Sequence, residues 1–234
     1  MNDTTIEIRR VDLRIGDLLR SANRIMGARF LPLVGLSTLA ILAIGFVPIV
    51  LEGALVIGLI VCFKRVRAGE DVSIETLFGG FQFFVETLLA RLLLFGIHVA
   101  LSALLLPLYG LFIYGAAEHH DGIIALAMLL FFMAVLPLAM FIQVMNGLTF
   151  AVMADHNVKG LAAVKLAARG MFFNPAFSAK LGAASLAITI LGMLLCGVGF
   201  LVAYPIMYLM IWLAAEKMFV STAPAEPAPE LSQN

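Results

Sequence analysis

Six apolar stretches divide the chain, and polar breaks or a turn signal separate them. The stretches cover residues 30–46, 49–63, 85–109, 122–154, 176–196 and 200–215. A membrane-spanning helix needs about 17–25 apolar residues, and the first two stretches are near the lower limit. Pro48 lies between these two, where a tight turn is expected. The pattern predicts an all-α polytopic membrane protein with six transmembrane helices paired as three hairpins.

An amphipathic segment precedes each predicted hairpin. In residues 13–29 and 157–173, apolar positions recur every three or four residues and cationic side chains occupy the other face. Residues 74–85 have the same spacing, interrupted by Gly79-Gly80. We expect cytoplasmic interfacial helices that contact anionic lipid headgroups. The cations expected to make these contacts are Arg14, Arg20, Arg24, Lys159, Lys165 and Arg169. An internal duplication would explain the threefold pattern. Alternatively, any chain with an even number of spans needs cytoplasmic connections between its hairpins, and such connections tend to be amphipathic.

The basic residues are distributed asymmetrically along this pattern. None of the 15 lysines and arginines lies between spans one and two, three and four, or five and six. The positive-inside rule therefore places both termini in the cytoplasm. We predict a cytoplasmic amphipathic segment at 1–29, a membrane domain at 30–217 and a disordered cytoplasmic tail at 218–234. The first residues, 1–11, are polar and expected to be frayed.

The composition supports a membrane location. The chain is 62% hydrophobic and 13% charged, whereas soluble proteins are about 45–50% apolar and about 25% charged. No basic tail or patch indicates a nucleic-acid partner. The two cysteines, Cys62 and Cys196, are expected near opposite membrane faces, where they cannot form a disulfide.

Few polar residues lie inside the apolar stretches, and each has two interpretations. His98, Gln143 and Asn146 could line an intramembrane polar path, or they could hydrogen-bond neighbouring helices. Glu86 and Arg91 could pair with each other near the cytoplasmic end of the third span.

Two polar clusters flank the fourth span. Glu118-His119-His120-Asp121 has metal-ligand chemistry, with His119 and His120 as the candidate ligands, or it is an exposed turn without metal. Asp155-His156-Asn157 is predicted to cap the following helix. No serine or cysteine nucleophile is placed beside these groups. We therefore expect no catalytic residues, no enzyme activity and no cofactor.

Several short motifs carry a family resemblance. They are Ala154-Asp155-His156-Asn157-Val158, Leu77-Phe78-Gly79-Gly80-Phe81, Gly197-Val198-Gly199 and Tyr204-Pro205. With them the chain resembles a broad group of bacterial multi-span proteins, most of them known only as domains of unknown function. It is similar to the membrane domain found beside some glycerophosphodiester phosphodiesterases. The resemblance implies a six-helix module of the bacterial inner membrane and no catalytic residues.

Pattern, charge and resemblance together indicate the location of the protein more than its activity. We expect an integral inner-membrane protein that handles or transports lipids or small amphiphiles. The alternative is a non-catalytic protein that binds a membrane partner or organises the cell envelope.

Overall fold

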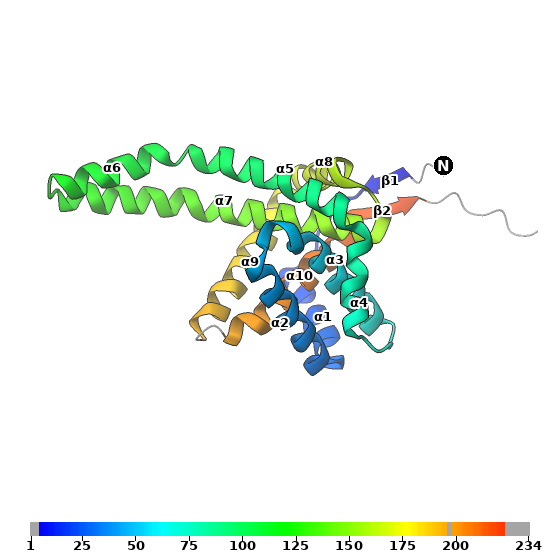
Figure 1. Ribbon diagram of the computed structural model, residues 1–234. Helices are drawn as coiled ribbons and strands as arrows, with labels where there is room; N and C mark the ends of the chain where they lie inside the picture. Colours follow the sequence, from blue (N-terminus) through cyan, green and yellow to red (C-terminus); the bar gives the residue numbers. More distant parts are fainter. Residues whose placement is uncertain (1–4, 196–197, 223–234) are drawn as a thin grey trace, which may run out of the picture.

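The computed structural model describes residues 5–195 and 198–222, which are almost entirely helical (Figure 1). The elements, in chain order, are β1 (Thr5–Ile8), α1 (Ile15–Ala28), α2 (Phe30–Phe46), α3 (Pro48–Arg67), α4 (Ile74–Phe78), the short 3₁₀ helix η1 (Gly79–Phe83), α5 (Phe84–Ala103), α6 (Leu106–Ala117), α7 (Asp121–His156), α8 (Gly160–Phe173), α9 (Pro175–Leu194), α10 (Val198–Met218) and β2 (Phe219–Thr222). The all-α prediction is confirmed apart from the two short strands.

Proline marks three of the helix boundaries. Pro48 and Pro175 are the first residues of α3 and α9, and Pro107 lies in the first turn of α6. A proline at the start of a helix needs no hydrogen-bond partner for its nitrogen, and it disfavours helical backbone in the residue before it. The α2–α3, α5–α6 and α8–α9 breaks follow from these positions.

Several helices are suited to a membrane interior. In the described residues, four helical segments are long and apolar enough to cross a bilayer. They are Ile74–Ala103, Asp121–His156, Pro175–Leu194 and Val198–Met218. Helices α1 and α2 meet at 99° and would form a fifth span if counted together. Helix α3 is not among them, because its 20 residues include Glu52, Lys64, Arg65 and Arg67. The chain is thus a membrane protein with several spans, and the predicted number of six is not confirmed.

A long arm projects from the other helices (Figure 1). It consists of residues 98–142, where the end of α5 and all of α6 pack along the first half of α7. Helix α7 has 36 residues, a length of about 54 Å at 1.5 Å per residue. Most of the large apolar side chains on the arm are exposed, including Leu104, Leu129, Phe132 and Met133.

The loop predicted at residues 110–121 is much shorter in the structure. Helix α6 continues to Ala117, and only Glu118 to His120 connect it to α7. Gly115 allows the two helices to meet closely here, because a Cβ at this position would lie 3.0 Å from Ile123. His119 adopts a left-handed backbone with φ 55°, which suits a tight reversal of the chain.

The remaining helices form a packed base below the inner half of α7 (Figure 1). The base comprises α1, α2, α3, α9, α10 and residues 143–156 of α7. Its centre is dry and tightly packed, since residues 53–60 of α3 and 207–215 of α10 are all buried. Phe63 and Trp212 are among the largest fully buried side chains. Helix α9 crosses α7 where Gly182 faces Met140 and Val144.

Both chain ends are ordered further than expected. Residues 5–8 and 219–222 pair as an antiparallel two-stranded sheet, with Ile8 opposite Phe219. The prediction of a frayed start is wrong for β1, and the prediction of a disordered tail from residue 218 is wrong up to residue 222. Residues 1–4 and 223–234 lie outside the described part of the chain. Phe219 is 2% exposed, so burial of its ring anchors β2 to the helices.

Candidate functional site

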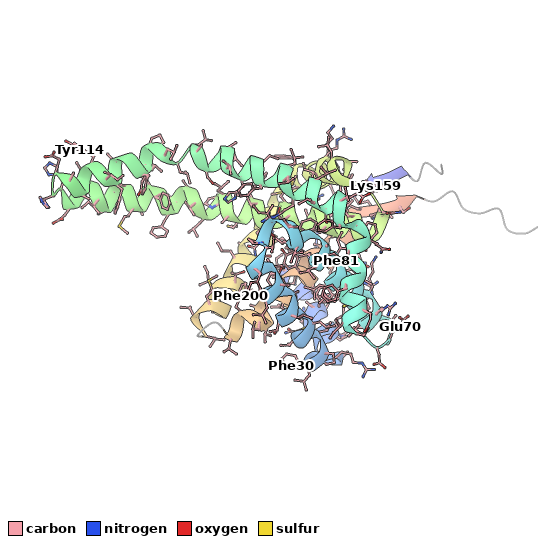
Figure 2. All side chains as sticks on the ribbon, viewed as in Figure 1. Phe30, Glu70, Phe81, Tyr114, Lys159 and Phe200 are labelled. Carbon is pink, nitrogen blue, oxygen red and sulfur yellow. The ribbon has the colours of Figure 1, made fainter. Side chains whose placement is uncertain are left out.

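An apolar groove runs along the arm between α5–α6 and α7. Its inner section, about 320 Å³ in volume, is lined by residues that include His98, Ser102, Val135 and Ile142. Its outer section, about 240 Å³, lies between α6 and the start of α7, with Phe112 and Met128 in its walls. Tyr109 and Phe131 line both sections, so the two adjoin along α7. Tyr114 marks the tip of the arm (Figure 2).

The polar groups of this groove are few. His98 and Ser102 lie in its inner section, and Tyr109 stands where the two sections meet. His98 is exposed on the surface of the arm, and an imidazole can donate and accept hydrogen bonds. An ionisable group inside a membrane span is costly, which makes His98 a candidate for a functional role. Apolar walls with a few placed polar groups are typical of a small-molecule site.

The structure does not join His98 to the two amides with which it was grouped. Gln143 turns toward α9 and α10, where its amide donates to Thr189 Oγ1 at 3.4 Å and to the Met207 sulfur. Asn146 is 7% exposed, and its Oδ1 has no hydrogen-bond partner within the described residues. Among the described residues, no hydrogen bond links Gln143 or Asn146 to His98. Gln143 thus links neighbouring helices by hydrogen bonds. This is the structural interpretation, as opposed to a place in a polar path.

A charged cluster lies where α3, α5 and α10 meet. Arg91 Nη2 is 2.6 Å from Glu52 Oε2, and the two side chains are only 17% and 14% exposed. The Tyr208 hydroxyl donates to Glu52 Oε1 at 3.5 Å, and the Tyr204 ring packs beside Tyr208 at 4.9 Å between centroids. The cluster links three helices through an ion pair and a hydrogen bond.

The predicted pair of Glu86 with Arg91 is wrong. Glu86 lies 3.6 Å from Lys159 at the start of α8, while Arg91 pairs with Glu52. Residues five apart on a helix are separated by about 140° around its axis, so they point to different neighbours. The signal that identifies Glu52 is its position: a carboxylate inside an apolar helix needs a cation from another helix.

Asp155 does not cap the following helix, as its sequence position suggested. Helix α8 begins at Gly160 without a side-chain cap. Asp155 instead accepts hydrogen bonds from Trp212 Nε1 at 3.0 and 3.2 Å and pairs with Lys64 at 2.5 Å. Asn157, with a left-handed φ of 53°, ends α7. The polar cluster therefore ties three elements of the base together and leaves no role for Asp155 in capping.

The basic residues predicted to contact lipid are all exposed. They are Arg14, Arg20 and Arg24 around α1, and Lys159, Lys165 and Arg169 around α8. Lys159 lies at the opposite end of the molecule from Tyr114 (Figure 2). Cys62 is buried and free, and Cys196 lies outside the described residues. Contact with lipid stays a prediction.

The tip of the arm carries the candidate metal ligands. His119 and His120 connect α6 to α7 and are exposed. Within residues 5–195 and 198–222, no three histidine, cysteine, aspartate or glutamate side chains gather closely enough to hold a metal ion. Two adjacent histidines are too few for a structural zinc site, which has four ligands.

Comparisons of the chain with protein-family models, with curated proteins and with solved structures found no match. The resemblance to the membrane domain found beside glycerophosphodiester phosphodiesterases therefore stays a prediction.

Proposed function

We propose that this protein binds the apolar chain of a lipid or small amphiphile in the groove of the arm, as part of lipid handling or transport in the membrane. The observation that carries the proposal is the shape and lining of the groove. From Met128 to Ile142 it follows 14 residue steps of α7, or about 21 Å. This length suits an extended acyl chain, with His98 and Ser102 available to a polar headgroup at the inner end.

The surroundings of the groove favour a ligand that arrives from the bilayer. The arm exposes large apolar side chains on many sides, among them Leu126, Leu129 and Leu136. A surface of this kind is stable in hydrocarbon and unfavourable in water. A groove in it is accessible to molecules dissolved in the membrane, and such molecules are amphiphiles.

We further propose that the chain crosses a bacterial inner membrane six times, with the tip of the arm outside and both termini in the cytoplasm. Helix α3 would then be the second span. Its Glu52 is paired with Arg91, and Lys64 and Arg67 are paired with Asp155 and Glu216 at its other end. These pairings reduce the free-energy cost of placing the charged side chains of α3 in a membrane. The charge content of α3 is the reason that it was not counted as a span by composition.

The orientation can be tested by cysteine labelling of intact cells. Glu118→Cys at the tip and Glu70→Cys after α3 are made in a chain whose Cys62 and Cys196 are replaced by alanine. A membrane-impermeant maleimide should label Glu118→Cys in intact cells and Glu70→Cys only after lysis. Labelling of both positions in intact cells, or of neither, would contradict the proposed orientation.

Ligand binding can be tested by photo-crosslinking with a fatty acid that carries a diazirine in its chain. Ala139→Trp fills the inner section of the groove, whereas Leu129→Trp adds the same ring on the exposed face of α7 outside it. Loss of burial for two methylene groups corresponds to about a tenfold loss of affinity. We expect that loss for Ala139→Trp and little change for Leu129→Trp.

The exposed surface of the arm also favours the second function, in which the protein binds a membrane partner or organises the envelope. In that case crosslinks from the arm would lead to another protein, and Leu129→Trp would weaken them as much as Ala139→Trp. Equal labelling by the fatty acid in both variants would argue against the groove and for this alternative.

A further inference from the structure

A second apolar groove lies where the arm meets the base, at the corner of α7, α8 and α9. It has a volume of about 270 Å³, and its walls include Met140, Phe141, Phe172 and Pro175. Phe141 and Phe172 face each other with 6.2 Å between ring centroids. The Ser178 hydroxyl in this corner donates to Met171 O at 3.3 Å, so it is already satisfied. The groove therefore presents an apolar surface to whatever occupies it.

The groove opens to the outside of the base. Phe172 is 70% exposed and Phe173, next to it, is 48% exposed. Large apolar rings exposed in this way are unfavourable in water, and they extend the apolar surface of the groove.

Exposed cations lie on α8 and α9, two of the helices that line this corner. On α8, Lys165, Arg169 and Phe172 follow one another at helical spacing and are all exposed. On α9, Lys180 is also exposed and directly follows Ala179 in the wall of the groove. Residues 157–215 contain no aspartate or glutamate. Of the ion pairs formed by the described residues, none includes these three cations.

A fourth cation comes from the N-terminal segment. The Arg10 guanidinium lies over the Phe173 ring, 5.8 Å from its centroid. Asn174 holds this segment in place, because its side chain accepts from Val11 N at 2.9 Å and donates to Arg9 O at 3.1 Å. The N-terminal segment thus brings the Arg10 guanidinium to this corner, and it also carries Asp12 two residues further on.

From this combination we infer that the corner of α7, α8 and α9 binds an anionic phospholipid of the cytoplasmic leaflet. An acyl chain lies against Phe141 and Phe172, and the phosphate interacts with Arg169 and Lys180. The inference goes beyond the proposed function, because this site shares no residue with the groove of the arm. Apolar walls and unpaired cations suit one molecule that has both an acyl chain and a phosphate.

The inference can be tested by native mass spectrometry of the purified full chain, titrated with phosphatidylglycerol or phosphatidylcholine. We expect phosphatidylglycerol to bind more tightly. Each juxtamembrane cation contributes about fivefold to such binding. Arg169→Gln and Lys180→Gln should therefore each weaken phosphatidylglycerol binding by about that factor, while phosphatidylcholine binding changes little. Phe172→Ala should weaken the binding of both lipids.

The control is Lys217→Gln, which removes the same charge from the exposed last turn of α10. It should leave phosphatidylglycerol binding nearly unchanged. Equal binding of the two lipids, or equal weakening by Lys217→Gln and Arg169→Gln, would overturn the inference. Competition by millimolar inorganic phosphate without any effect of Phe172→Ala would also overturn it, because the site would then recognise phosphate alone.

Discussion

Arg91 of α5 and Glu52 of α3 form an ion pair between two helices, with 2.6 Å between Nη2 and Oε2. The Tyr208 hydroxyl from α10 donates to the same carboxylate. Helix α5 continues directly into the arm, so this pair joins the root of the arm to the base. It is the only charged link between α3 and α5 among the ion pairs of the described residues.

Removing one partner of this pair should destabilise the protein more than removing both. Glu52→Leu leaves the Arg91 charge buried without a counter-ion, which costs about 3–5 kcal/mol. Combining Glu52→Leu with Arg91→Leu removes the uncompensated charge and should recover much of that loss. Thermal unfolding in detergent measures the difference. A double variant no more stable than Glu52→Leu would show that the pair contributes nothing through charge.

The contact between α3 and η1 should tolerate no side chain at Gly80. A Cβ there would overlap the carbonyl oxygen of Ala54, whereas a Cβ at Gly79 would meet nothing within 4 Å. We expect Gly80→Ala to lower the free energy of unfolding by about 1–3 kcal/mol. Gly79→Ala, one residue away, is the matched control and should be nearly neutral. Similar unfolding temperatures for the two variants would contradict the close approach of these backbones.

Asp155 should stabilise the packing of α3, α7 and α10 through its contacts with Trp212 and Lys64. Asp155→Ala leaves the Trp212 indole N–H and the Lys64 ammonium without this acceptor. A buried donor left unpaired costs about 1–3 kcal/mol. Trp212 is the single tryptophan, so the fluorescence melt reports on this location directly. His156→Ala, at the adjacent residue, should unfold like the unmodified chain, and equal losses in both variants would refute the assignment.

Asn174 should hold the N-terminal segment against the corner of α8 and α9. Its side chain bonds Val11 N, Arg9 O and Gly170 O. Asn174→Ala removes all three hydrogen bonds and should destabilise the protein by about 1–3 kcal/mol. The amide of Val11 should then exchange hydrogen faster. Asn23→Ala on the exposed face of α1 should leave that exchange unchanged, and slow exchange in both variants would show that Asn174 is not the anchor.

The local features of the fold follow closely from local sequence. Runs of apolar residues predict α2, α3, α5, α7, α9 and α10, and Pro48 predicts the boundary between α2 and α3, because both signals depend on neighbours within one or two helical turns. The exposure of Lys165 and Arg169 also follows from helical spacing. The extension of α6 to Ala117 does not, because it depends on the close packing of Gly115 against Ile123.

Hydropathy by itself determined that this chain is helical and that it belongs in a membrane, and the charge distribution predicts that its cations lie on one side. These properties are sums over many residues, and no single contact can reverse them. Only the tertiary structure decided that Arg91 meets Glu52, that Asp155 meets Trp212 and that α5–α6 and α7 enclose a groove. Such pairings join residues far apart in sequence, and they depend on how helices cross, which periodicity does not specify.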